Sequence, residues 1–203
     1  MAIKNIIFDF GKVLVDYDFE KFFRSYIKDP KRCQEFAYAI NDPEVMKRLD
    51  RGAEPIDVIL KDVVDRHPAF EEEIRYFDRH YLEIVTGEVP GMRDLMTRLK
   101  DHGYRLFGLT NWCSKVYGTI SQFGIFNLLE GYVISSEEKL IKPEPEIYLR
   151  LCERFDLKPE ECIFTDDKAE NIEGAISVGM KAILFRNAGQ FENDLSQLFQ
   201  NHC

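Results

Sequence analysis

The sequence predicts an α/β fold, a Rossmann-like three-layer sandwich with a parallel sheet, into which an all-helical cap is inserted. Two observations lead to this class. Short β-rich runs alternate with amphipathic helical runs along most of the chain, as in parallel sheets that helices cover on both faces. One long stretch shows helical patterning alone. We therefore expect a core formed by residues 1–15 and 89–203 and a helical cap formed by residues 16–88.

Strands are expected where β-branched and aromatic residues gather in short runs. The clearest such runs are residues 4–10, 104–110, 131–135, 162–165 and 181–185. Helices of the core are expected at residues 91–103, 146–155 and 169–179. The first of these follows Pro90 and stops at Gly103, and both residues suit helix boundaries.

The cap sequence contains no convincing strand between about residues 16 and 88. Phe19, Phe22, Phe23 and Tyr26 recur at the spacing of one helix face, which favours the buried side of a cap helix over a recognition surface. Further amphipathic segments are expected at about residues 31–40, 43–50, 55–66 and 70–84. Because this insertion follows the first strand, it would lie above the carboxyl end of that strand and act as a lid.

Composition and net charge limit the classes of molecule that are expected to be the main partner of this protein. The chain has 203 residues, 45% of them hydrophobic, which is enough for one sizeable core. Its net charge of −9 argues against nucleic acid or an anionic membrane as the main partner. No apolar run reaches the roughly 20 residues of a membrane helix, and the five scattered cysteines have the spacing of reduced thiols rather than metal ligands. We expect a cytoplasmic protein, a monomer or homodimer, with a small-molecule partner.

Polar side chains follow three of the expected strands, and ligands of open parallel sheets bind beyond the carboxyl ends of the strands. These side chains are Asp9, Thr110, Asn111, Asp166 and Asp167. Lys142, in a loop just before a helix, is a further candidate. Carboxylates, a hydroxyl and an ammonium together suit a divalent cation and a phosphate. A carboxylate can attack phosphorus once Mg²⁺ relieves the charge repulsion, and the lysine and hydroxyl can hold the phosphoryl oxygens.

Four segments, FDFGKVL, LTN, KPEPEIY and FTDDKAENIEGA, resemble in this order the four motifs of the haloacid dehalogenase superfamily of hydrolases. The resemblance covers nearly the whole chain, and the helical insertion matches that family's cap after the first strand. It implies that Asp9 is a nucleophile that forms an aspartyl-phosphate and that Thr110 hydrogen-bonds the phosphoryl group. It also implies that Lys142 neutralises charge on the nucleophile and on the phosphate.

The same resemblance implies a Mg²⁺ site. Its ligands would be Asp9, Asp166 and the backbone carbonyl of Gly11, with Asp167 in support. The expected activity is a Mg²⁺-dependent phosphatase of small-molecule phosphate esters. Two alternatives stay open: a metal-independent hydrolase similar to 2-haloacid dehalogenases, and a non-catalytic protein that binds a phosphorylated ligand. The paired acids Asp166 and Asp167 favour the phosphatase.

Gly11 departs from the family's pattern, in which most phosphatases carry an aspartate that serves as general acid and base. Such help is typically worth ~10²–10⁴-fold in rate. The DxG start, together with Arg51-Gly52 in the cap, is similar to a branch that resembles glucose-1-phosphatases. This implies a preference for sugar 1-phosphates or other activated phosphates, whose leaving groups need less protonation. Asp16 is the nearest substitute acid in the sequence, and bound water is another.

Three further residues are candidates for substrate binding, and each has a structural alternative. Asn111 could instead cap a helix, and Trp112 could be a packing residue. Arg51 lies in a helical segment, where charged side chains are usually solvated.

Overall fold

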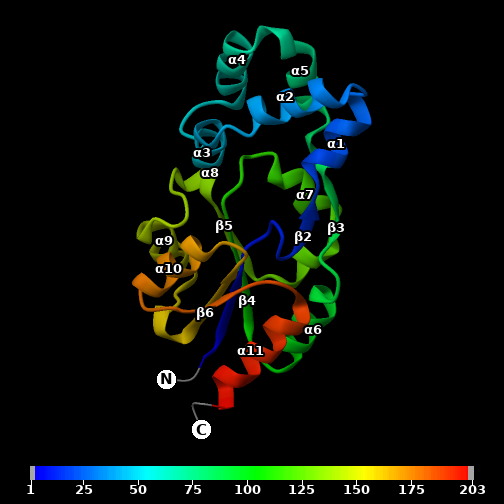
Figure 1. Ribbon diagram of the computed structural model, residues 1–203. Coiled ribbons are helices and arrows are strands. Elements are labelled where there is room, and N and C mark those ends of the chain that lie inside the picture. Colours follow the sequence, from blue (N-terminus) through cyan, green and yellow to red (C-terminus); the bar gives the residue numbers. More distant parts are fainter. Residues whose placement is uncertain (1–2, 201–203) are drawn as a thin grey trace.

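The computed structural model describes residues 3–200 and contains a five-stranded parallel sheet of order β5-β4-β1-β6-β7 (Figure 1). The strands are β1 (Asn5–Phe8), β4 (Arg105–Thr110), β5 (Gly131–Ile134), β6 (Cys162–Asp166) and β7 (Lys181–Leu184). Every residue of the central strand β1 is buried, because helices cover both of its faces. The predicted α/β class and the parallel sheet are confirmed.

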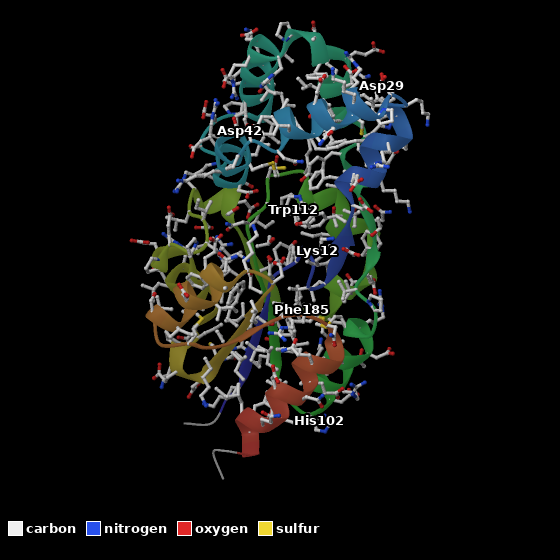
Figure 2. The ribbon with its side chains drawn as sticks, viewed as in Figure 1. Lys12, Asp29, Asp42, His102, Trp112 and Phe185 are labelled. Carbon is white, nitrogen blue, oxygen red and sulfur yellow. The ribbon has the colours of Figure 1, made fainter. Side chains whose placement is uncertain are left out.

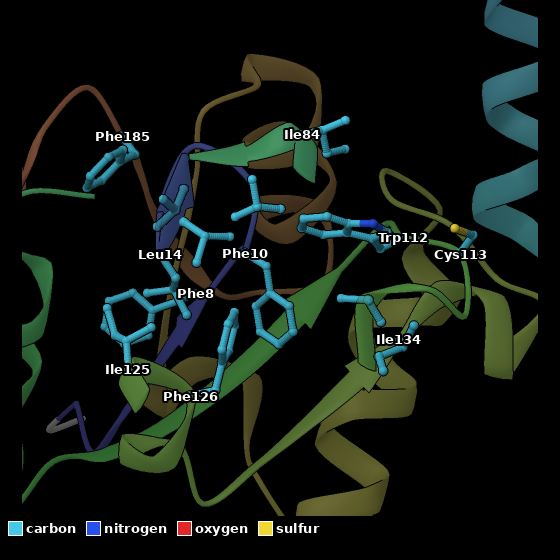
Figure 3. Close-up of a cluster of buried hydrophobic side chains, with 14 of the residues drawn as sticks. Phe8, Phe10, Leu14, Ile84, Trp112, Cys113, Ile125, Phe126, Ile134 and Phe185 are labelled. Atoms are coloured by element: carbon cyan, nitrogen blue, oxygen red, sulfur yellow. The ribbon is translucent and has the colours of Figure 1, made fainter. Parts of the chain in front are cut away.

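Helices form a layer on each face of the sheet. Alternate side chains of β1 point to opposite layers, so Ile7 packs in one hydrophobic cluster while Ile6 and Phe8 pack in the other. The cluster around Ile7 includes buried residues of α9 (Pro145–Phe155) and α10 (Ala169–Ser177). The opposite cluster, part of which is shown in Figure 3, includes residues of α6 (Met92–Asp101) and α11 (Ala188–Gln200).

Shorter elements complete the core. They are α7 (Val116–Gln122), η3 (Gly124–Leu128), α8 (Ser135–Glu138) and η4 (Pro159–Glu161). No helix within residues 3–200 is long and apolar enough to cross a membrane. Four cysteines in this range are free and buried, and Cys203 lies outside the described residues.

The cap helices lie together beyond the carboxyl end of the sheet (Figure 1). They are α1 (Phe19–Tyr26), α2 (Pro30–Ile40), α3 (Pro43–Arg51), α4 (Ile56–Arg66), η1 (Pro68–Phe70), α5 (Glu71–Arg79) and η2 (Tyr81–Ile84). Asp18, Asp29 and Asp42 cap the first three, each accepting a hydrogen bond from a backbone N–H of its helix. Within the aromatic stripe of α1, Phe22 and Phe23 are buried, so the stripe is mainly the packing face that the sequence predicted.

The expectation of no strand between residues 16 and 88 was wrong. β2 (Val15–Tyr17) and β3 (Val85–Glu88) pair antiparallel and form a two-stranded sheet at the two ends of the insertion. Both strands are very short, and each finds its partner far along the chain, so neither produces a local periodic pattern. The helix expected over residues 70–84 is also divided, into α5 and η2. The division into core and cap at residues 15/16 and 88/89 stays a prediction.

Candidate active site

The ends of three neighbouring strands, β1, β4 and β6, bring together polar side chains that the sequence singled out, with the acids at β1 and β6. Asp9 directly follows β1, and its backbone N–H donates to the carbonyl of Thr165 at 2.9 Å. In the register of the sheet, Phe8 lies opposite Gly108 of β4 and Thr165 of β6. The side chains that follow these residues therefore meet at one edge of the sheet. Asp9 and Asp166 are both buried there.

The Lys142 ammonium lies between these two carboxylates. Its Nζ is 2.8 Å from Asp9 Oδ1 and 2.6 Å from Asp166 Oδ2, and it also donates to the carbonyl of Leu109 at 2.9 Å. The Asn111 side chain fixes the backbone of this loop from both sides. Its Nδ2 donates to the Lys142 carbonyl at 2.9 Å, and its Oδ1 accepts from the Lys142 N–H at 2.8 Å. Asn111 thus orients Lys142.

Two buried carboxylates face one buried ammonium, and the ionisation of the site reflects that imbalance. Burial raises the pKa of Asp9 to about 7 against the opposing effect of Lys142, and the negative charge of Asp166 adds to the rise. Burial would also raise the pKa of Asp166, but Lys142 and hydrogen bonds from Lys168 N–H and Asn171 Nδ2 outweigh it and lower that pKa. The two carboxylates carry more negative charge than the Lys142 ammonium can offset, so this site can accept a further cation.

The acids at this edge fit Mg²⁺. Asp9, Asp166 and Asp167 each offer one carboxylate oxygen, and these oxygens lie within 4.8 Å of one another. Burial, together with the charge of Asp166, raises the pKa of Asp167, so these carboxylates repel one another without a cation. Carboxylate oxygens are hard ligands of the kind that Mg²⁺ takes in proteins. Gly11 lines the same pocket, and its carbonyl as a fourth ligand stays a prediction.

The Thr110 hydroxyl is free to donate a hydrogen bond. Thr110 is the last residue of β4, its side chain is buried, and its Oγ1 has no hydrogen-bond partner among the described residues. A buried polar atom left in this state costs roughly 1–3 kcal/mol. Since Thr110 lines the pocket together with Asp9 and Lys142, a phosphoryl oxygen placed over Asp9 could accept this hydrogen bond.

The pocket over these residues has walls from both the core and the cap. Trp112 forms part of the core wall: its Nε1 donates to Tyr81 Oη at 2.8 Å, and its ring lies edge-on to Tyr17. Figures 2 and 3 show Trp112 below the cap, at the end of the core sheet. The cap contributes the side chains of Tyr17, Phe19, Met46, Asp50, Tyr81 and Ile84. The pocket is therefore acidic at its base and mainly aromatic and apolar toward the cap.

Two sequence candidates do not lie in this pocket. Arg51 forms an ion pair with Glu144 and donates to the Lys139 carbonyl, so its guanidinium is held at the junction of cap and core. Asp16, considered as a substitute acid, accepts hydrogen bonds from Lys12 Nζ at 2.5 Å and from Tyr17 N–H at 2.9 Å. Neither residue belongs to the pocket lining within residues 3–200.

Several lining residues were missed by sequence reasoning. Asp50 carried a signal, because it lies in the last turn of α3, where the helix dipole disfavours a carboxylate. Tyr17, Tyr81 and Asn171 also line the pocket. Nothing in the local pattern marks the two tyrosines, whose positions depend on how the cap folds back onto the core.

A family model described as haloacid dehalogenase-like hydrolase matches residues 3–179, and the chain belongs to this family. It is 36% identical over 110 residues to a glyceraldehyde 3-phosphate phosphatase of Pyrococcus furiosus. That match covers 53% of this chain and 46% of the relative, about half the length of each. It is also 23% identical over 186 residues to a phosphorylated carbohydrates phosphatase of Thermotoga maritima, covering 89% of this chain and 84% of the relative.

The fold is shared with solved structures. One is a family enzyme from Bacteroides thetaiotaomicron in complex with magnesium and inorganic phosphate, with a TM-score of 0.73 and 20% identity. The superposition covers 92% of this chain and 96% of that one. At this identity the likeness shows a common fold.

Proposed function

We propose that this protein is a Mg²⁺-dependent phosphatase that hydrolyses small-molecule phosphate esters through an aspartyl-phosphate on Asp9. The observation that carries the proposal is the Lys142 ammonium held between Asp9 and Asp166, beside the unpartnered hydroxyl of Thr110. A nucleophilic carboxylate, a fixed positive charge and a free donor at one pocket are the groups that phosphoryl transfer requires. The printed names of the Pyrococcus and Thermotoga relatives, both phosphatases, support it.

In the first half of the reaction, an Asp9 oxygen forms a bond to phosphorus while the bond from phosphorus to the leaving oxygen breaks. Lys142 holds Asp9 in place and offsets the charge that builds on the phosphoryl oxygens, and Thr110 donates to one of them. Bound Mg²⁺ would supply charge neutralisation between the carboxylates and the phosphate, with Asp9, Asp166 and Asp167 as its ligands. In the second half, water attacks phosphorus and releases Asp9 and inorganic phosphate.

The preferred substrates are sugar 1-phosphates or other activated phosphates. Position 11, directly beside the nucleophile's strand end, has no side chain that could protonate a leaving group. Anomeric and acyl phosphates lose their leaving groups more readily than simple alkyl phosphates. The phosphorylated carbohydrates phosphatase of Thermotoga supports a sugar phosphate as the substrate class.

The test is Mg²⁺-dependent phosphate release from glucose 1-phosphate, acetyl phosphate, glucose 6-phosphate, p-nitrophenyl phosphate and glycerol phosphate. Asp9→Asn is the inactive control, and Asp57→Asn, an exposed acid of the cap, is the matched control. Release that needs both Mg²⁺ and Asp9 supports the phosphatase, and a preference for glycerol phosphate contradicts the substrate class. Halide release from a 2-haloacid in EDTA would establish the dehalogenase alternative. Tight phosphate-ester binding without turnover would establish the binding protein.

A further inference from the structure

We propose that Asp50 of the cap is the general acid and base of this site, giving a proton to the leaving oxygen and then taking one from the attacking water. The inference rests on the proposed function, because it assigns a proton donor to that reaction. An alkoxide leaving group needs such a donor, and the strand end next to Asp9 offers only Gly11.

The acids on the floor of the pocket are already engaged. Asp9 is the nucleophile, and Asp166 accepts hydrogen bonds from Lys142, Asn171 and the Lys168 N–H. Asp167 is one of the three acids that would hold Mg²⁺ in the proposed reaction. Asp50, from the cap, lines the same pocket as Asp9, Lys142 and Asp167.

The other titratable side chains of the pocket wall cannot serve both halves of the reaction. Burial raises the pKa of Tyr17 and of Tyr81, so each holds its proton too tightly to act as a base toward water. Lys168 carries an ammonium, which donates but has no lone pair to accept a proton. A carboxyl group can do both, in turn.

The backbone of Asp50 is fixed to the core. Ser135 Oγ donates to the Asp50 carbonyl at 2.5 Å, and Lys139 Nζ donates to the carbonyl of Gly52. Gly52 has a φ of +60°, and a Cβ at this position would lie 2.6 Å from Ser136 Cβ, so α3 ends in close contact with α8. These contacts hold Asp50 over the pocket as long as the cap lies on the core.

The Asp50 carboxylate has no hydrogen-bond or ion-pair partner within the described part of the chain, residues 3–200, although it is partly buried. Burial raises the pKa of Asp50 to about 6, against the opposing positive charges of Lys168 and Lys142. The other groups that sense its charge are Tyr17, Tyr81 and Cys113. A carboxyl group that titrates here is near the condition for efficient proton transfer in neutral solution.

The proton balance closes over one turnover. As the bond from phosphorus to the leaving oxygen breaks, the Asp50 carboxyl proton moves to that oxygen and an alcohol departs. The Asp50 carboxylate then takes a proton from the water that attacks phosphorus. The bond from phosphorus to Asp9 breaks, inorganic phosphate leaves, and Asp50 is again protonated.

The experiment compares Asp50→Asn with Asp57→Asn, the exposed-acid control on the cap, using two substrates in the presence of Mg²⁺. Acetyl phosphate releases acetate, which leaves without protonation. Glucose 1-phosphate releases an anomeric sugar hydroxyl, which needs less help than a simple alkoxide but still depends more on a proton donor than acetate does. We expect Asp50→Asn to lower kcat/KM for glucose 1-phosphate on the order of 10²-fold and to change kcat/KM for acetyl phosphate less than about 3-fold. Asp57→Asn should change neither.

A pH series gives a second readout. The value of kcat/KM for glucose 1-phosphate is measured for the wild type and divided by the value for Asp50→Asn. This ratio should fall as the pH rises through about 6, because the Asp50 carboxyl group of the wild type loses its proton there. Equal losses on both substrates, an effect on KM alone, or a ratio that does not change with pH would overturn the role of Asp50. If the wild-type protein releases phosphate from neither substrate, the proposed phosphatase function itself fails, which is a separate outcome.

Discussion

The ring of Tyr17 occupies the space into which a side chain at position 11 would project. A Cβ on Gly11 would lie 2.9 Å from Tyr17 Cε1, closer than real Cβ atoms approach a neighbour. Tyr17 cannot easily give way, because its ring packs edge-on against Phe19 and Trp112. The missing acid at position 11 is thus tied to the way the first residues of the cap pack over the core.

This packing makes a prediction about Gly11→Ala. In the wild-type background, we expect overpacking to lower the free energy of unfolding by about 1–3 kcal/mol. In a Tyr17→Ala background, the same change should be neutral or stabilise by up to about 1 kcal/mol, because alanine restricts the unfolded chain. Urea denaturation of the four proteins measures the coupling. An equal effect of Gly11→Ala in both backgrounds would show that Tyr17 is not the obstacle.

Thr110→Val should separate stability from activity. The hydroxyl has no partner among the described residues, so replacing it with a methyl group should leave the unfolding free energy unchanged or raise it by roughly 1 kcal/mol. Loss of the donor should lower kcat/KM on the order of 10²-fold. Thermal unfolding and phosphate release on the same samples measure both. A destabilised but fully active variant would contradict this account of Thr110.

Lys142→Met should make stability depend on Mg²⁺. Removing the ammonium leaves two buried carboxylates without their counter-charge, which costs on the order of 3 kcal/mol. Because Mg²⁺ can supply that charge, it should stabilise the variant more than the wild type. Unfolding in EDTA and in Mg²⁺ gives the comparison. Lys61→Met, which breaks an exposed pair with Asp65, should cost less than about 1 kcal/mol and respond to Mg²⁺ as the wild type does.

Asp50→Asn should stabilise the protein at neutral pH. A group whose pKa is higher in the folded state favours folding when protonated, so its contribution is present below pH 4 and is lost as the pH rises through about 6. Because the side chain is only partly buried, we expect Asp50→Asn to be more stable than wild type by roughly 1–2 kcal/mol at pH 8. The difference should vanish near pH 4. Equal stability at both pH values would show that the Asp50 carboxylate is well solvated.

The Arg51–Glu144 ion pair should affect the position of the cap more than the stability of the fold. The two side chains are 30% and 36% exposed, so a double-mutant cycle with alanine should give a coupling of about 0.2–1 kcal/mol. We expect Arg51→Ala and Glu144→Ala to have a higher KM for glucose 1-phosphate than the wild type, because without the ion pair the end of α3 is less firmly held on the core. The surface pair Arg98–Glu192 is the control, and its loss should leave KM unchanged.

The site residues that the sequence predicted best are those that lie in a short local pattern of their own. Short runs and motif order identified the strand that Asp9 follows, the strand that ends in Asp166 and the loop that carries Lys142. The fold brings all three together. Their distances could not be predicted, because they depend on strand register and on how Asn111 holds the Lys142 loop.

The cap side of the site was much less accessible to sequence reasoning. Asp50, Tyr17 and Tyr81 reach the pocket through packing between segments that are distant in sequence. The pairing of β2 with β3 is likewise a long-range contact between two very short strands. Arg51, the neighbour of Asp50, illustrates the limit: a one-residue step along α3 separates the pocket from the junction with Glu144.

The central place of β1 in the sheet also bears on how the chain folds. Asn5 pairs with Arg105 on one side and with Cys162 on the other, so this strand gains both of its neighbours only through contacts between distant parts of the sequence. Such contacts close long loops and slow folding. During synthesis β1 has no partner until β4 has emerged, and Asp9 meets Asp166 only after β6 is complete. A chain halted before β6 therefore lacks both the finished sheet and the reactive site.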